Sequence, residues 1–241
     1  NTHNPIKIGR RTIKDYKYFG PKLSVEDIIL KSSNIGTVRI AQKIGSTNLK
    51  AFYKNLGLFD TTTLELPETK GTKPQKPKKW NNLETATASY GHGIAVSPVH
   101  LATAYSILVN GGVKIKPSII KQTKPNMQTD KIISESTSKE VRLILEKVVT
   151  KGTARDSDFG GYGVGGKTGT AEKPNPIEGG YYENKVISTF ASVFPISTGK
   201  FVIVVTLDEP ENNFGSESYR YASKTAVPVA AKIISRVAPL L

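Results

Sequence analysis

The chain has 241 residues, of which 37% are hydrophobic and 22% charged, and its formal net charge is +14. This is an ordinary globular composition, long enough to bury a sizeable core. Cysteine is absent, which excludes a disulfide framework and a thiolate nucleophile, and with only His3, His92 and His100 available we expect no metal site. The longest apolar run, Phe201 to Leu207, is too short to cross a membrane.

The first part of the chain carries closely spaced helix signals. Ser24, with Asp27 three residues later, forms a capping-box pattern, so a helix is expected to follow Ser24. A second helical run extends from about Gly36 to Ile44 and ends at Gly45. Asn34 is therefore predicted to lie at a junction between two short helices.

Three more helices are predicted further along the chain. Leu49 to Leu56 is a short one ending at Gly57, and Ser97 followed by proline opens another that runs to Asn110. Apolar residues then recur at helical spacing from Val141 to Val149, ahead of Gly152, so one face of that helix must be buried.

A lysine-rich segment, Glu68 to Lys79, separates these helices into two groups. Its prolines, Pro74 and Pro77, exclude a helix interior, so we interpret it as an exposed loop. A nucleic-acid site would place aromatic or arginine side chains beside such lysines, and only Trp80 follows. We therefore predict no nucleic-acid partner.

The last third of the chain is rich in strand signals. Val186 to Phe194 and Phe201 to Leu207 are predicted antiparallel strands, and the alanine-rich stretch from Lys224 to Val237 is predicted to be a helix covering them. The predicted fold class is α/β (α+β), an antiparallel sheet flanked by helices plus an all-helical lobe. One domain would span residues 1–241, with a helical lobe from about 20 to 155 and a sheet lobe from about 160 to 241.

Two polar segments are candidates for a binding site. From Gly165 to Ala171, glycines leave the backbone bare around Lys167, Thr168 and Thr170, as the docking edge for a small anionic peptide would require. A glycine-rich turn with a surface lysine is the plainer interpretation. At the helix junction, the polar side chains of Ser32 to Asn34 can face a cleft, or can simply cap the next helix.

The order of several motifs resembles a known family. The segments are Lys31 to Gly36, Ser89 to Ile94, Leu101 to Tyr105, Asn110 to Gly112 and Gly165 to Ala171. Together they resemble the transpeptidase domain of class B penicillin-binding proteins, and most closely the division-specific peptidoglycan D,D-transpeptidases. The resemblance covers nearly the whole chain and implies a fold of the penicillin-binding protein and serine β-lactamase type.

The resemblance implies roles for six residues. Ser32 would pass a proton to the leaving nitrogen, and the Asn34 amide would hold the substrate's backbone amide. Lys167, with the hydroxyls of Thr168 and Thr170, would receive the carboxylate of a D-alanyl-D-alanine stem peptide or of a β-lactam, and Gly169 would let the peptide lie along the strand. No metal or organic cofactor is implied.

One departure from the family pattern concerns the nucleophile. The family uses a serine with a lysine three residues later on one helix, ahead of the S-x-N motif, and no such pair precedes Ser32. Ser118 with Lys121 follows a proline in an expected strand, where the two side chains would point apart. Ser136 with Lys139 lies at a helix start, where Ser136 is expected to be the cap. We therefore expect an N-terminally incomplete domain, inactive alone.

The resemblance further implies an inner-membrane anchor outside this chain, a periplasmic location and divisome membrane proteins as partners. Alternatives are a D,D-carboxypeptidase or serine β-lactamase, a non-catalytic receptor for wall fragments or β-lactams, and a binder of anionic polymers. Among lesser candidates, His92 is expected to be structural, and Asp208 with Glu209 to form a solvated turn ahead of Pro210.

Overall fold

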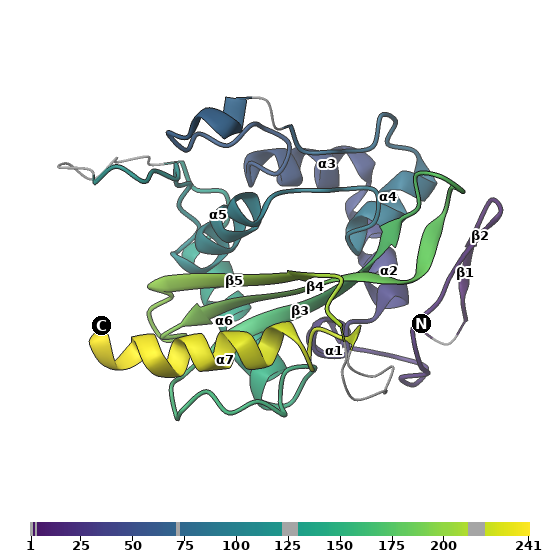
Figure 1. Ribbon diagram of the computed structural model, residues 1–241. Coiled ribbons are helices and arrows are strands. Elements are labelled where there is room, and N and C mark those ends of the chain that lie inside the picture. Colours follow the sequence, from purple (N-terminus) through teal and green to yellow (C-terminus); the bar gives the residue numbers. More distant parts are fainter. Residues whose placement is uncertain (1, 3, 71–72, 122–129, 212–219) are drawn as a thin grey trace. The chain divides into compact units, whose positions relative to one another are not determined.

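Two compact units, Asn1–Ser138 and Lys139–Leu241, make up the chain. The computed structural model describes residues 2, 4–70, 73–121, 130–211 and 220–241 (Figure 1). The boundary between the units falls within helix α6 (Glu135–Thr150), so the amphipathic part of that helix belongs with the sheet.

The first unit is mainly helical. It holds a hairpin of β1 (Ile6–Ile8) and β2 (Arg11–Ile13), then α1 (Val25–Leu30), α2 (Asn34–Ile44), α3 (Ser46–Asn55), a 3-10 turn at Pro67–Lys70, α4 (Asn82–Ser89), α5 (Pro98–Val109) and the start of α6. Ile6 and Ile13 of the hairpin pack with Ile35, Val38 and Ala86, so the hairpin is fixed to α2 and α4 by buried apolar contacts.

Capping residues begin these helices much as their sequence predicts. The capping box of Ser24 and Asp27 is formed at α1, and Ser97 caps α5 with Pro98 in its first turn. The hairpin and α4 were not predicted, because three-residue strands and a short run of small and polar residues give little periodicity. The lysine-rich segment contains the 3-10 turn, and its Lys73, Lys78 and Lys79 are exposed, as an exposed loop requires.

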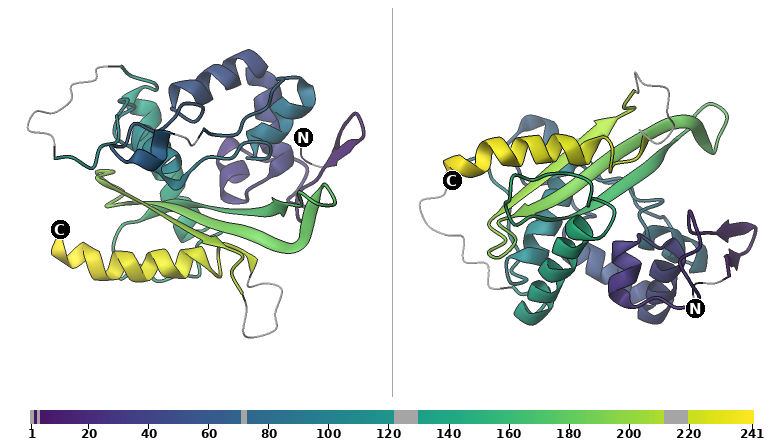
Figure 2. Two further views of the ribbon diagram at one scale, coloured as in Figure 1. Left: turned by 45° about the horizontal axis from the view of Figure 1, so that its top comes forward. Right: turned by 90° about the horizontal axis from the view of Figure 1, so that it is seen from below.

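The second unit is a sheet with a helix along one face. Strands β3 (Gly165–Pro174), β4 (Tyr181–Phe194) and β5 (Phe201–Asp208) pair antiparallel in the order β3-β4-β5. Helix α7 (Ala226–Val237) lies along the sheet, followed by a 3-10 turn at Ala238–Leu240 (Figure 2). The antiparallel sheet and its covering helix are confirmed.

The core of this unit fills the space between α7 and the strands. Phe190 and Phe194 of β4 pack there with Val205 of β5 and with Val227 and Ile234 of α7. Burying a side chain of this size contributes roughly 1.5–3 kcal/mol, so this contact fixes the sheet on the helix. Toward its start, β4 extends past the end of β5 and pairs there with β3 alone (Figure 2).

Candidate active site

The S-x-N motif forms the turn between α1 and α2. Ser32 has a positive φ of 55°, a left-handed conformation that is uncommon outside glycine. Ser33 is fully buried and caps α2, because its Oγ accepts the Gly36 N–H at 2.9 Å. The helix begins at Asn34, two residues earlier than predicted, so Asn34 is the first residue of α2 rather than a linker. Capping, the plainer interpretation of this motif, is correct for Ser33.

Asp15, which is distant in sequence, forms hydrogen bonds with this turn. It was not predicted from the sequence as part of the site. Its Oδ2 accepts the Ser33 hydroxyl at 2.7 Å, and its Oδ1 accepts the Ile35 N–H at 3.0 Å. The neighbouring carbonyl of Lys14 accepts the Asn34 side-chain amide at 3.3 Å. A bond between side chains 18 residues apart leaves no local pattern that could reveal it.

The second motif lies on β3, an edge strand of the described sheet. In the β3-β4 ladder, Lys167 is opposite Ala191 and Thr170 is opposite Ser188. In the described sheet, β3 is paired along one side, with β4. An edge strand presents backbone N–H and C=O groups along one side, which an extended peptide can pair with.

The three positions at which this strand has glycine differ in the space available for a side chain. A Cβ on Gly165 would come within 2.5 Å of Ile196, and one on Gly166 within 2.5 Å of the Phe190 ring, so packing demands glycine at both positions. Among the described residues, a Cβ on Gly169 would meet no atom closer than 4.0 Å. Packing against the described part of the chain therefore does not explain Gly169, whereas the close approach of a ligand backbone would.

Lys167 is a half-buried cation. Its Nζ donates to the Thr168 carbonyl at 2.9 Å. Burial away from water lowers the pKa of the Lys167 ammonium from 10.5 to about 8. The amine is consequently still mostly protonated at pH 7, and an anion near it would meet a weakly hydrated positive charge.

The two threonine hydroxyls are oriented by neighbours in the same unit. Thr170 Oγ1 accepts the Ala222 backbone N–H at 3.0 Å, which leaves its own proton available for an acceptor. Thr168 Oγ1 lies 2.6 Å from Thr153 Oγ1, and when Thr153 is the donor, Thr168 keeps its proton as well. Thr153 was not identified as a supporting residue from the sequence.

The predicted site residues thus form two groups. Ser32 and Asn34 lie together in the helical unit, and Lys167, Thr168, Gly169 and Thr170 lie together on β3 of the sheet unit. That both groups grip one ligand stays a prediction.

Three pairs have a serine followed three residues later by a lysine, the spacing of the family's nucleophile. Their surroundings do not suit a nucleophile and its base. Ser118 is in irregular structure rather than in the predicted strand, its hydroxyl donates to Glu65 Oε1 at 2.7 Å, and Lys121 is exposed. The pair Ser197 and Lys200, overlooked in the sequence, is exposed in the turn between β4 and β5.

Ser136 and Lys139 are exposed in the first turns of α6. Ser134, not Ser136, caps this helix, because its Oγ accepts the Thr137 N–H at 3.1 Å. The prediction that Ser136 is the cap was wrong. An exposed lysine lacks the desolvated setting that makes an amine a base for a serine hydroxyl.

The remaining titratable candidates have structural explanations. His100 is buried between Ser97 Oγ, 2.7 Å from its Nδ1, and the Asp60 carbonyl, 2.8 Å from its Nε2; because a carbonyl only accepts, Nε2 carries the proton. His92 lies in a turn against the Tyr90 ring, and His3 is outside the described residues.

Asp208 and Glu209 form ion pairs at the end of β5, where a solvated turn was predicted. Lys173 Nζ lies 2.9 Å from Asp208 and 2.6 Å from Glu209, and Lys185 lies 3.1 Å from Glu209. Hydrogen bonds from Lys173 and then Lys185 lower the pKa of the Glu209 carboxyl. Both carboxylates are therefore occupied by surface cations.

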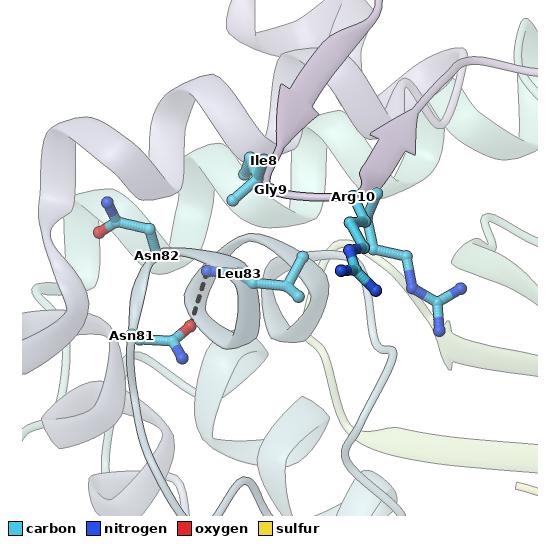
Figure 3. A pocket seen from close by; sticks show the side chains of 7 residues that line it. Ile8, Gly9, Arg10, Asn81, Asn82 and Leu83 are labelled. Atoms are coloured by element: carbon cyan, nitrogen blue, oxygen red, sulfur yellow. Dashed lines mark hydrogen bonds between the residues drawn. The ribbon is translucent and has the colours of Figure 1, made fainter.

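A hollow of about 510 Å³ lies in the helical unit, beside the β1–β2 hairpin and the start of α4 (Figure 3). It is lined by Ile8, Gly9, Arg10, Arg11, Asn81, Asn82 and Leu83. Its arginines are exposed, and the Asn81 side chain caps α4 by accepting the Leu83 N–H at 2.9 Å. No predicted site residue lines this hollow.

An antiparallel sheet with a K-T-G edge strand and a covering C-terminal helix, in a chain whose helical unit carries S-x-N, defines the class that includes penicillin-binding proteins and serine β-lactamases. The family model "Penicillin binding protein transpeptidase domain" matches residues 1–235. The chain belongs to this family.

Individual relatives agree with this assignment. The chain is 34% identical over 250 residues to a probable peptidoglycan D,D-transpeptidase FtsI of Caulobacter vibrioides, covering 100% of this chain and 42% of that relative. The apo transpeptidase domain of Burkholderia pseudomallei penicillin-binding protein 3 superposes with a TM-score of 0.85 at 31% identity, over 98% of this chain and 70% of that one. Penicillin-binding protein 3 of Mycobacterium tuberculosis complexed with aztreonam gives a TM-score of 0.84 at 25% identity, over 98% and 56%.

Proposed function

We propose that the full-length protein is a peptidoglycan D,D-transpeptidase that cross-links stem peptides through a serine acyl-enzyme and is acylated by β-lactams. Membership of the transpeptidase family supports the reaction class. The observation that carries the proposal is the edge of β3, where a half-buried ammonium and two oriented hydroxyls flank a glycine that packing leaves open.

The β3 edge would bind the donor peptide. Its terminal carboxylate would accept hydrogen bonds from Lys167 and from the hydroxyls of Thr168 and Thr170. The peptide backbone would lie against Gly169 as an added strand, and the Thr170 N–H would be one of two oxyanion donors. A β-lactam would present its carboxylate to the same donors.

The S-x-N turn would serve proton transfer and orientation. A serine Oγ, activated by a lysine amine, attacks the carbonyl carbon of the penultimate D-alanine, and the carbon–nitrogen bond to the terminal D-alanine breaks. Ser32 would relay the proton to that departing nitrogen, while Asn34 holds the substrate's amide. The amine of a neighbouring stem peptide then attacks the ester and releases the serine. We assign the nucleophilic serine and its lysine to a segment outside these 241 residues.

The cellular setting forms part of the proposal. The protein would be anchored in the inner membrane, with this domain in the periplasm and divisome membrane proteins as partners. Among the described residues, no helix is long and apolar enough to cross a membrane. The net charge of +14 suits an anionic wall polymer.

Labelling by a fluorescent penicillin tests the proposal. We expect the full-length protein to be labelled covalently, and Lys167→Ala to be labelled at least about tenfold more slowly, the factor for one lost charge-assisted hydrogen bond. Lys173→Ala is the matched control, because this lysine is on the same strand but pairs with Asp208 and Glu209. Equal, rapid labelling of wild type and Lys167→Ala would refute the role of Lys167. An unlabelled wild type would instead favour a receptor.

A further inference from the structure

Two tyrosines and a phenylalanine lie together at the surface of the helical unit, in the segment that joins β2 to α1. This aromatic segment runs from Tyr16 to Phe19. Tyr16 is 69% exposed and Tyr18 is 60% exposed, whereas Phe19 is half-buried. The Tyr16 and Phe19 rings meet edge to face, with their centres 5.2 Å apart and an angle of 78° between their planes. Exposed aromatic side chains that gather in this way are typical of an interaction surface.

Contacts on both sides hold the aromatic segment in place. Just before it, the Asp15 carboxylate accepts the Ser33 hydroxyl at 2.7 Å. Just after it, the Gly20 carbonyl accepts the hydroxyl of Thr2 at 2.9 Å, and Thr2 is itself buried. Because the segment is anchored at both ends, a ligand that binds to it would have little conformational freedom to remove.

The charges around the aromatic segment favour an anionic ligand. Lys17 Nζ lies 5.5 Å from the centre of the Tyr16 ring and 5.7 Å from the centre of the Phe19 ring, within cation–π distance of both. Two further exposed lysines lie on either side of the segment, Lys14 and Lys22. The surface therefore combines aromatic rings with positive charge.

We infer that the aromatic segment binds the glycan strand that carries the stem peptide. This inference rests on the proposed function and names the part of the substrate that this surface would receive. The C–H face of a sugar ring is apolar and packs on the face of an aromatic ring, where the π electrons place partial negative charge. N-acetylmuramic acid, the sugar to which the stem peptide is joined, adds the carboxylate charge that the lysines attract.

The position of the aromatic segment suits this ligand. Tyr16 directly follows Asp15, whose carboxylate is hydrogen-bonded to Ser33 in the S-x-N turn. An extended peptide spans about 3.3 Å per residue, so a stem peptide of a few residues keeps its sugar within roughly 10–20 Å of the turn that binds it. The sugar would thus reach the exposed rings while its peptide contacts the S-x-N turn.

Binding of a peptide-free glycan tests the inference. The probe is a fluorescent tetrasaccharide of alternating N-acetylglucosamine and N-acetylmuramic acid, and its anisotropy measures the Kd for the full-length protein. We expect Tyr16→Leu to raise this Kd about fivefold, because leucine keeps an apolar side chain but lacks the ring face. Tyr16→Phe should bind within about twofold of wild type, because the ring remains.

Tyr162→Leu is the matched control, because Tyr162 is also exposed, at 39%, but belongs to the sheet unit. Its Kd should equal that of the wild type, and an equal increase in both leucine variants would overturn the inference. So would tighter binding of a single-stranded oligonucleotide than of the tetrasaccharide at about 0.15 M salt, since lysines beside aromatic rings also bind bases.

The same preparation separates this inference from the proposed function. A wild-type protein that fluorescent penicillin labels but that does not bind the tetrasaccharide would overturn the inference while the proposed function stands. A wild-type protein that penicillin does not label would overturn the proposed function itself.

Discussion

The proposed role of Lys167, binding a carboxylate, places two opposing demands on its ammonium group. Burial disfavours the charge of the ammonium and lowers its pKa to about 8, yet the same loss of water strengthens attraction to a carboxylate. The amine must keep its proton to act in this way. In the proposed role, Lys167 would therefore bind an anion only at pH values below or near 8.

The lowered pKa predicts a pH dependence of stability. Between pH 8 and about 10.5, the unfolded chain holds a proton on Lys167 that the folded chain has released, so the free energy of unfolding rises with pH in this window. Urea unfolding of wild type and Lys167→Met from pH 7.5 to about 9.5, below the tyrosine range, measures it. The variant should show a smaller rise, and identical slopes would contradict the prediction.

Glycine substitutions should separate packing from ligand binding on β3. Gly166→Ala forces a Cβ against Phe190 and the Ala191 carbonyl and should lower the free energy of unfolding by about 1–3 kcal/mol. Gly169→Ala meets open space and should change stability by less than about 1 kcal/mol, yet it should slow acylation of the full-length protein. Thermal melts with penicillin labelling check both, and a Gly169→Ala protein labelled at the wild-type rate would contradict the role of Gly169.

Single residues also mark the limit of what the sequence could predict. Lys167, Thr168 and Thr170 became candidate site residues because their types and order form a motif. Asp15 did not, because its partners lie far from it in sequence. The sequence likewise could not separate Gly166 from Gly169, because the difference arises in the fold, where the Phe190 ring fills the space beside Gly166 and not that beside Gly169.

At the scale of elements, the starts of α1 and α5 were predictable from their capping residues. Ser24 and Ser97 each accept a backbone N–H group, a local interaction that a short pattern encodes. The β1-β2 hairpin was not predictable from its three-residue strands, because it is held by buried contacts with α2 and α4. The unit boundary within α6 likewise depends on packing.

One buried serine ties α6 to the end of α5. The Ser138 hydroxyl donates to the Leu108 carbonyl at 2.7 Å and accepts the Gly111 N–H at 3.0 Å, without exposure to water. Ser138→Ala should therefore lower the free energy of unfolding by about 1–3 kcal/mol, because both backbone groups lose their partner. Ser136→Ala, at an exposed position two residues earlier in the same helix, should change the free energy of unfolding by less than about 0.5 kcal/mol. Denaturant unfolding checks this, and equal effects of the two variants would contradict it.

For the whole molecule, the proposed function gives each of the two units a different role. The helical unit carries Ser32 and Asn34 on a turn that Asp15 contacts, and the sheet unit carries Lys167 and its neighbours on an edge strand. Family membership explains why both motifs occur in one chain. The central claim is that both act on the same substrate.

A crystal structure of the full-length protein acylated by a β-lactam tests that claim most directly. The account predicts that the β-lactam carboxylate lies within hydrogen-bond distance of Lys167 or of the Thr168 and Thr170 hydroxyls, and that Ser32 and Asn34 line the same groove. A bound β-lactam that contacts only one of the two motifs, with the other on a separate surface, would contradict it.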